Sequence, residues 1–474
     1  MNLPTTVPRP RLFSLAWPLF LELLLGIAVG VVGTALAARL GDNAGAAFAL
    51  AHHVFGTLFI LFRIIGAGVG VVLTQALGAG RRDAADAVAR ALLGASTWLG
   101  LLVAVPALAA PGALLGVMNA PAEVLPLAAP LLMLLAPAML LDAWTSSMTA
   151  VMRAHLRARE TLAVMVAMHS LHLALMWPLM YGVTFGMTSA VTYGTVSGLT
   201  LRGFVPSALG LPGFALALLL ARAVALALLL WLWRARLNLR PQRSDWWQLK
   251  RAELAEVARI GLPSAAENIT YRLAYMVSVA VVGGMGAAAL ATHAYVQQVL
   301  MVVLLCGLVT GLSAETVVGH LIGAGHFKQA HGVVRRGLAR GLVLSVVVAA
   351  VAALLSPWLM RIFTADLQII AMATVLLWWT VLLEPGRTFN LVIINALRAA
   401  GDARYPVLAG AASMAVVLAG GSWLLGVHFE LGLPGVWLAY IADEWLRGLL
   451  MWRRWSTLAW VPHARASRRR LAAR

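Results

Sequence analysis

The stretch from Ile260 to Gly325 repeats an earlier part of the chain at a constant offset of 245 residues, without a gap. The equivalent residues are prolines, glutamates, glycines and polar pairs: Pro18 and Pro263, Glu22 and Glu267, Gly41 and Gly286, Gly66 and Gly311, Gly78-Ala-Gly80 and Gly323-Ala-Gly325, His52-His53 and Gln297-Gln298. Chance does not preserve one offset in both apolar and polar positions over so long a stretch. The chain is therefore a duplication, and its two halves must fold alike.

The apolar segments between these landmarks are too long and too frequent for a soluble domain. The chain is 61% hydrophobic and 11% charged, whereas a typical soluble domain is about 25% charged. Helices of ~20 apolar residues satisfy all their backbone hydrogen bonds inside a bilayer. The sequence therefore predicts an all-α integral membrane protein. The first apolar segment contains Pro18 and Glu22 and is too long for a cleavable signal peptide, and the single Cys306 excludes an intramolecular disulfide.

Charged and glycine-rich turns divide the chain into about twelve spans, six in each half. In the first half we expect spans at 12–38, 44–77, up to Pro111, 124–151, 162–183 and up to Trp233. The expected domains are an N-lobe of residues 1–233 (helices 1–6), a cytoplasmic linker of residues 234–257, a C-lobe of residues 258–460 (helices 7–12) and a basic cytoplasmic tail of residues 461–474. The pair Trp246-Trp247 indicates that part of the linker lies at the membrane surface.

The basic residues alternate between loops, and this alternation predicts the orientation. One face carries the N-terminus, the linker, the tail and four basic loops: Arg81/Arg82, Arg153 to Arg159, Lys328/Arg335/Arg336 and Arg398/Arg404. The other face has few basic residues: Arg39, Arg202 and Arg361. By the positive-inside rule we expect a multi-pass plasma (inner) membrane protein with both termini cytoplasmic. The net charge of +18 has the same origin. We expect no nucleic-acid partner, because the arginines form no continuous stripe.

An even number of spans in each half gives the two halves the same orientation, related by an axis along the membrane normal. Parallel repeats of this kind form two-lobed secondary transporters, whose substrate binds near the midplane between the lobes. The sequence has no phosphate-binding loop and no Cys-x-x-Cys, His-Glu-x-x-His or Gly-x-Ser-x-Gly motif. We therefore expect no enzyme. Gly66, Gly68 and Gly70 lie in an apolar helix and indicate close helix packing.

Three motifs carry a resemblance to a known family. In the first helix Trp17-Pro18-Leu-Phe-Leu-Glu22 is followed by Gly41-Asp42, and helix seven contains Ile260-Gly-Leu-Pro263-Ser-Ala-Ala-Glu267-Asn268. The third motif is the pair of Gly-Ala-Gly tripeptides together with the segment from Ala396 to Pro406. In these motifs the chain resembles the multidrug and toxic compound extrusion (MATE) family of cation-coupled antiporters, over about residues 12–460. The resemblance implies two six-helix bundles in a V, around a central cavity open to one side at a time.

The sequence departs from that family at one position. Family members often show Val-Asp-Thr late in helix one, with the Asp implicated in proton coupling. This sequence reads Val32-Gly33-Thr34 at the same place. The usual N-lobe carboxylate is therefore missing, and cation coupling must depend on other residues.

Acidic residues inside the expected spans are the candidates for cation coupling, because ionisable groups are costly in a bilayer and tend to be functional. The cation-coupling candidates are Glu267, Glu384, Glu22 and Asp142, and Glu315 is a further acid within a span. Glu22 and Glu267 lie near the bilayer middle at ~1.5 Å of rise per residue. Asp142 and Glu384 form a rough pair in helices four and ten. The resemblance favours Glu267 and Glu384, because family members bind their coupling cation in the C-lobe.

Structural roles for these four acids remain open. Glu22 and Glu267 could instead bond backbone groups freed by Pro18 and Pro263, which precede them by four residues. Asp142 and Glu384 could instead neutralise basic residues within the spans: Arg63, Arg272 or Arg387.

Seven polar side chains are candidates to line a substrate cavity: Asn268, Tyr271, Tyr275, Gln297, Gln298, His52 and His53. The alternative is that they form hydrogen bonds between helices, worth ~0.6 kcal/mol each in membranes. His169 and His172 share a helix face. A metal site would need further ligands that the sequence does not supply there, so we expect no metal.

The expected function is export of a small, amphipathic, cationic organic compound in exchange for H⁺ or Na⁺ by alternating access. Coupling ion and substrate would compete for one negative site, and each would favour one facing state of the lobes. One alternative is a flippase for a lipid-linked or other anionic amphiphile, which the arginines within the spans keep open. A less favoured alternative is a membrane-embedded transferase. We expect no cofactor besides the coupling ion, and a monomer in the lipid bilayer.

Overall fold

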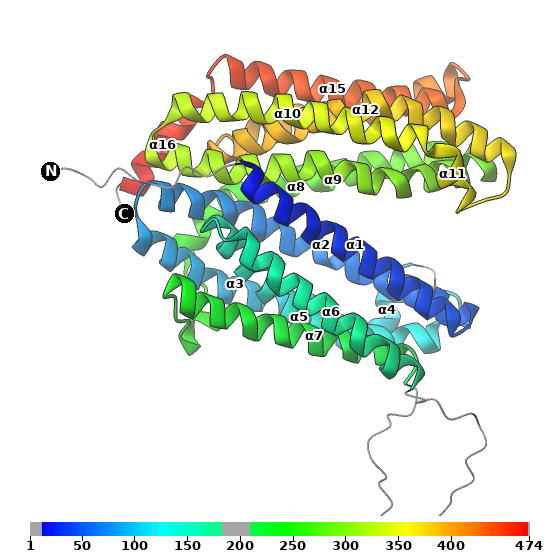
Figure 1. Cartoon of the computed structure of the whole chain (residues 1–474), viewed down its shortest axis with the longest axis horizontal. Helices are drawn as coiled ribbons and strands as arrows, with labels where there is room; N and C mark the ends of the chain where they lie inside the picture. The colour runs from blue at the N-terminus through cyan, green and yellow to red at the C-terminus, as the bar shows by residue number, and fades with distance from the viewer. Residues whose placement is uncertain (1–11, 119, 183–208, 473–474) are drawn as a thin grey trace, which may run out of the picture.

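The computed structural model describes residues 12–118, 120–182 and 209–472, without the side chains of residues 59–65 and 67. Every regular element in this part of the chain is a helix, as Figure 1 shows. The expected all-α fold is confirmed. Of the residues singled out in the sequence, Arg202 and the side chain of Arg63 lie outside the described part.

The N-lobe is built from seven α-helices: α1 (Leu12–Arg39), α2 (Asp42–Gly78), α3 (Arg82–Ala109), α4 (Pro111–Gly116), α5 (Leu125–Ala154), α6 (Ala158–Tyr181) and α7 (Leu211–Leu232). A π-helix, η1 (Trp233–Leu237), continues α7, and a short 3₁₀ helix, η2 (Arg243–Trp246), lies in the linker. The helix ends agree with the expected spans to within a few residues.

The C-lobe repeats this order. It contains α8 (Arg251–Gly283), α9 (Ala287–Ala324), α10 (Phe327–Leu354), α11 (Ser356–Arg361) and α12 (Leu367–Ala399). One composite helix follows, made of α13 (Arg404–Ser413), η3 (Met414–Gly420), α14 (Gly421–Trp423) and η4 (Leu424–His428). The lobe ends with α15 (Gly432–Ser456), and α16 (Val461–Ala472) closes the described chain.

The duplication is visible in the helix boundaries. α3 and α10 begin and end 245 residues apart, and so do the short helices α4 and α11. α2 and α9 begin at the same offset, and α5 and α12 end at it. The register that the sequence predicted therefore extends beyond the stretch in which the residues themselves repeat.

Nine helical segments in the described part of the chain are long and apolar enough to cross a membrane. α2, α8 and α15 are 37, 33 and 25 residues long, and with them the long segments number twelve. α15 contains Asp443, Glu444 and Arg447 in its middle, so its composition alone does not mark it as a span.

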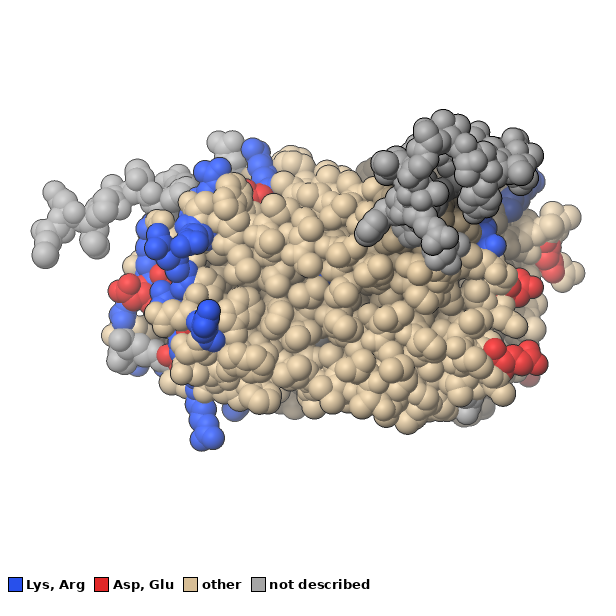
Figure 2. Space-filling model, turned by 90° about the horizontal axis from the view of Figure 1, so that it is seen from below, with Lys and Arg blue, Asp and Glu red and all other residues tan. Residues whose placement is uncertain are grey.

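The two lobes contact each other at one end of the molecule and diverge toward the other end (Figure 1). Lys and Arg side chains gather at the end where the lobes meet, and a broad uncharged band separates them from the opposite end (Figure 2). We call this the basic end; the turns between helices there, and the first helical residues after them, contain Arg81, Arg82, Arg157, Lys328 and Arg404. An uncharged band between charged ends is what a bilayer requires of the protein surface.

Glycines let the helices of the two lobes approach closely at the basic end. A Cβ added at Gly78 would lie 2.1 Å from the carbonyl oxygen of His320, and one added at Gly323 would lie 2.0 Å from the carbonyl oxygen of Gln75. Gly78 and Gly323 are equivalent residues of the duplication, so each lobe presents the same glycine to the other. No larger side chain would fit at either position without separating the lobes.

The linker and the tail both contain helical residues. α8 begins at Arg251, inside the predicted linker of residues 234–257. The linker packs on α3 and α5, because the indole of Trp98 donates to the carbonyl oxygen of Trp247 at 2.9 Å and the rings of Trp144 and Trp246 are 4.9 Å apart. The tail of residues 461–474 contains α16, which lies where the two lobes meet (Figure 1).

Candidate coupling and substrate sites

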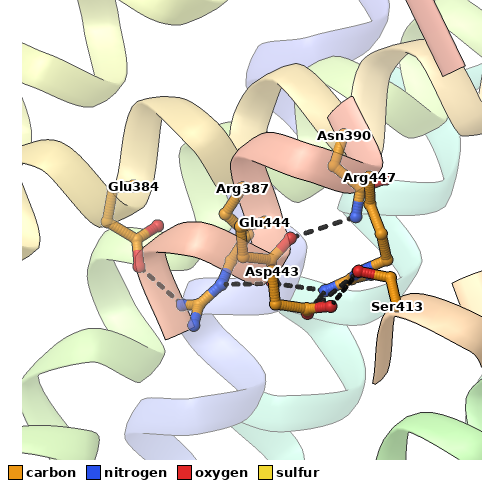
Figure 3. Close-up of polar contacts among 7 residues, drawn as sticks. All are labelled: Glu384, Arg387, Asn390, Ser413, Asp443, Glu444 and Arg447. Carbon is orange, nitrogen blue, oxygen red and sulfur yellow. Dashed lines mark hydrogen bonds and ion pairs between the residues drawn. The ribbon is translucent and has the colours of Figure 1, made fainter. Parts of the chain in front are cut away.

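A buried cluster of charged side chains lies between α12, α13 and α15 (Figure 3). We call it the C-lobe charge cluster, and its members are Glu384, Arg387 and Asn390 from α12, Ser413 from α13, and Asp443, Glu444 and Arg447 from α15. None of them is more than 8% exposed. Spacings of three and four residues place these side chains on one face of each helix, and the two faces meet inside the lobe.

The guanidinium groups of the cluster lie between its carboxylates. Arg387 Nη1 is 2.5 Å from Glu384 Oε1, and Arg387 Nε is 3.3 Å from Glu444 Oε1. Arg447 Nη2 is 2.6 Å from Asp443 Oδ2 and 3.0 Å from Glu444 Oε1. Glu444 therefore joins the two arginines into one network.

The three carboxylates differ in how many donors they have. Glu444 also accepts a hydrogen bond from Asn390 Nδ2 at 3.0 Å, and Asp443 accepts one from Ser413 Oγ at 2.7 Å. Glu384 is bonded to Arg387 alone. Because three carboxylates face two guanidiniums, one negative charge in this buried site has no partner of opposite sign. A buried charge without a counterion is costly, so the cluster is suited to take up one cation.

Two of the predicted substrate-site residues lie beside the cluster. The rings of Tyr271 and Tyr275 stack with centroids 6.2 Å apart, and the Arg447 guanidinium lies 5.8 Å from the centroid of the Tyr271 ring. Both tyrosines line a small pocket that also exposes Arg387 and Glu444. The pocket gives the charge cluster an aromatic wall, and the faces of aromatic rings attract cations.

Glu267 and Glu22 each form an ion pair. Glu267 pairs with Arg398, and Glu22 Oε1 lies 3.0 Å from Arg153 Nη1. Arg153 and Arg398 are equivalent residues, so the same pair occurs once in each lobe. The alternative structural role required Glu22 and Glu267 to bond backbone groups. In the structure these two carboxylates bond guanidinium groups instead.

Asp142 is fully buried and lies 2.6 Å from Arg222 Nη1 of α7. Asp142 and Glu384 lie in the equivalent helices α5 and α12, as a rough pair would, but three residues apart in register. At the offset of 245, Asp142 corresponds to Arg387, because α5 and α12 end at equivalent residues. Glu384 is paired with Arg387, as the alternative structural role predicted. The partner of Asp142 is Arg222, which was not predicted from the sequence.

Gly33 lies among aromatic rings. A Cβ added there would be 3.0 Å from the Phe214 ring and 3.4 Å from the Phe48 ring. The His172 ring stands at 65° to the Phe214 ring, with centroids 5.1 Å apart. The place of the family's usual N-lobe carboxylate is therefore filled by apolar side chains from α2 and α7.

The other predicted cavity residues are not part of the pocket beside the cluster. Asn268 Nδ2 donates to the Ser264 carbonyl oxygen of its own helix at 2.8 Å. Four further residues have exposed or half-buried side chains: His52, His53, Gln297 and Gln298. Arg272 is exposed, and Glu315 is buried beside Gly70 at the meeting of the lobes.

Three charged residues of the cluster were not predicted from the sequence: Asp443, Glu444 and Arg447. A signal was available, because acids and a base three and four residues apart in the last expected span read as a buried ion pair on one helix face.

Comparison with known proteins decides the family. The MatE family profile matches residues 18–178 and 263–424, two segments that begin at the equivalent prolines Pro18 and Pro263. The chain belongs to the MATE family. It is therefore a multidrug efflux transporter and a multi-pass membrane protein. Its fold has the two lobes that the duplication predicted.

Relatives of this MATE transporter match along nearly its whole length. The uncharacterized transporter YisQ of Bacillus subtilis (strain 168) is 30% identical over 450 residues, which are 95% of this chain and 94% of that protein. The probable multidrug resistance protein NorM of Bradyrhizobium diazoefficiens is 28% identical over 468 residues, 94% of this chain and 92% of that protein. The outward-facing conformation of a multidrug resistance MATE family transporter superposes with a TM-score of 0.81 at 19% identity, over 97% of this chain and 100% of that chain.

Proposed function

We propose that this MATE transporter exports a small, amphipathic organic cation in exchange for protons, and that the C-lobe charge cluster is where protons are taken up. The observation that carries this proposal is the ratio of three buried carboxylates to two buried guanidiniums in one network. A proton neutralises the surplus negative charge, and so does a cationic substrate. The two therefore compete, which is what exchange requires.

Glu384 is the carboxylate that binds the proton in this proposal. It has one donor, Arg387, whereas Glu444 has three donors and Asp443 has two. Protonation of Glu384 therefore breaks the fewest bonds. It also leaves Arg387 paired with Glu444, so no guanidinium is stranded.

Protons are favoured over Na⁺ by the same contacts. A Na⁺ ion needs several free oxygen atoms at once, whereas the oxygens of Asp443 and Glu444 already accept bonds from arginine, asparagine and serine. The neutralised arginines also argue against the flippase alternative, because an anionic headgroup would have to displace carboxylates from Arg387 and Arg447.

We also propose that the basic end faces the cytoplasm. The positive-inside rule favours this orientation, and it places both termini and the linker on the cytoplasmic side of the plasma (inner) membrane. The lobes then diverge toward the outside (Figure 1). In this proposal the protein works as a monomer, and its partners are the substrate and the lipid bilayer.

Dye efflux from proteoliposomes tests the coupling proposal. We expect efflux of a cationic dye under an imposed proton gradient, little under a sodium gradient, and a loss of at least about tenfold in Glu384→Gln, since Gln keeps the shape but does not titrate. Glu123→Gln, an exposed acid at the far end, is the matched control. Proton-driven efflux at the wild-type rate in Glu384→Gln would overturn the assignment. Efflux driven by sodium alone would identify Na⁺ as the coupling ion.

A further inference from the structure

Two hydrogen bonds cross between the lobes at the basic end. Gln75 Nε2 of α2 donates to the carbonyl oxygen of Ala399, the last residue of α12, at 2.7 Å. His320 Nε2 of α9 lies 2.8 Å from the carbonyl oxygen of Ala154, the last residue of α5. Because the carbonyl accepts, the histidine Nε2 carries the proton. Each lobe therefore supplies one donor to the other lobe.

These two bonds are equivalent by the duplication. Gln75 and His320 are 245 residues apart, and so are Ala154 and Ala399. Both donor side chains are buried, with exposures of 4% for Gln75 and 7% for His320. The bonds lie beside the glycine contacts of Gly78 and Gly323, one turn away. An approximate two-fold axis therefore passes between the two bonds.

The acceptors explain why such bonds are suited to a gate. Carbonyl groups in the last turn of a helix have no partner within their own helix, so each lobe satisfies such a group of the other lobe. When the lobes separate, water can serve both donor and acceptor, and the net contribution of each bond to closure is modest. The two bonds therefore favour the closed state of the basic end by a modest free energy, and the lobes can still separate.

We propose that Gln75 and His320 form a latch that holds the basic end of the transporter closed, and that breaking both bonds is part of the step that opens the cavity to that side. This proposal concerns the movement of the lobes and does not depend on the identity of the coupling ion. Its failure would leave the assignment of Glu384 untouched. Gln75 and His320 are positioning residues in this proposal, since neither contacts the charge cluster.

Distance measurements between spin labels test the latch in the full chain. The labels are placed at equivalent exposed positions on the two lobes, Asp83→Cys and Lys328→Cys, in a Cys306→Ser background. Electron–electron double resonance in lipid nanodiscs then gives the ratio of long to short distances at the basic end. Gln75→Leu and His320→Leu should each raise this ratio about fivefold, the equivalent of about 1 kcal/mol for one hydrogen bond.

The duplication supplies the conservative variant. His320→Gln places at one half of the latch the residue that already works in the other half, so we expect it to retain the parent distance distribution. Thr310→Val removes a hydrogen bond within α9 and is the control for bond loss that does not cross the lobes. If a leucine variant is not monodisperse, Gln75→Ala and His320→Ala replace it. Leucine variants with the parent distribution would overturn the latch, and so would a shift in His320→Gln as large as that in His320→Leu.

Discussion

Because Glu267 has a buried partner, we expect a substitution of this residue to change the stability of the protein as well as its transport activity. If Glu267 only coupled the cation, Glu267→Gln would keep the fold and abolish gradient-driven efflux. In the structure Gln would leave the Arg398 guanidinium, which is buried, without its carboxylate. Removing one member of a buried pair costs about 3–5 kcal/mol. We therefore expect Glu267→Gln to unfold at a clearly lower temperature than the wild type.

The double variant Glu267→Gln/Arg398→Gln should recover most of that stability, because it removes both charges of the ion pair. Thermal unfolding followed by tryptophan fluorescence in detergent measures both, and the equivalent pair Glu22/Arg153 offers the matched comparison. A single variant as stable as the wild type would mean that the pair contributes nothing to the fold. Efflux by a stable double variant would remove Glu267 from the coupling residues.

The sequence predicted which single residues within a helix are important, but it did not predict their contacts with other helices. Glu384 and Glu267 could be found because an acid within an apolar run is costly and therefore conspicuous. Their partners could not be found in this way. Arg398 is more than a hundred residues from Glu267, and its approach depends on how the fold brings α8 and α12 together. The side chains that fill the space at Gly33, from Phe48 and Phe214, are likewise brought together only by the packing of α1, α2 and α7.

Among the elements, the linker helix η2 depends on one carboxylate. Asp245 accepts hydrogen bonds from the backbone N–H of Gln242 at 2.9 Å and from Lys250 Nζ at 2.9 Å. Burial raises the pKa of this carboxyl, but the bonds from Lys250 and Gln242 outweigh burial and hold the pKa below its usual value. These bonds hold the turn from Gln242 to Lys250 in one conformation.

This shift gives the linker a pH dependence with a definite sign. Because the pKa of Asp245 is lower in the folded state, its contribution is fully present above the unfolded pKa of about 3.9. It is lost as the pH falls through the lower, folded value. Hydrogen exchange of peptides spanning residues 240–250, corrected for intrinsic rates, should therefore show protection that falls below about pH 4. Asp245→Asn should have lower protection and no such transition, whereas Glu123→Gln should keep the wild-type profile. A transition that persists in Asp245→Asn would assign it to another group.

Helix boundaries were predictable wherever apolar length and charged turns coincide, as in α1 and α3. Because of the duplication, the helix boundaries of the second half were as predictable as those of the first half. The position of α16 was not predictable, because its sequence is basic and reads as a solvated tail. Its order comes from contacts that exist only once both lobes have formed. Ala464 is buried in the C-lobe core, and Leu471 packs against a cluster that combines N-lobe residues with Val257, Ile260 and Ala403 of the C-lobe.

For the whole molecule, the orientation proposed above predicts which cysteines an impermeant thiol reagent reaches in intact cells. The alternation of basic loops places positions 83, 157, 245 and 402 inside, and positions 42, 200 and 430 outside. Asp245 and Asp402 are each only 2% exposed, so cysteines there would resist the reagent on either side. Exposed neighbours replace them: Gln248 and Arg404. Position 200 lies outside the described residues.

In a Cys306→Ser background we expect Asp83→Cys, Gln248→Cys and Arg404→Cys to resist the reagent, because the basic end is cytoplasmic. Asp42→Cys and Glu123→Cys at the far end should react. Permeabilised cells supply the control, since all five positions are exposed and should react there. A Gln248→Cys variant that reacts in intact cells would reverse the orientation.

The contacts of α16 also have a consequence for how the protein is made. A ribosome completes the N-lobe first, and domains generally form in the order of their synthesis. α16 follows the whole C-lobe in the sequence, and Leu471 lies near the C-terminal end of this helix. The N-lobe surface beside Leu471 therefore stays uncovered while the C-lobe is still being inserted. A chain that has not yet reached α16 thus differs at this surface from one that has.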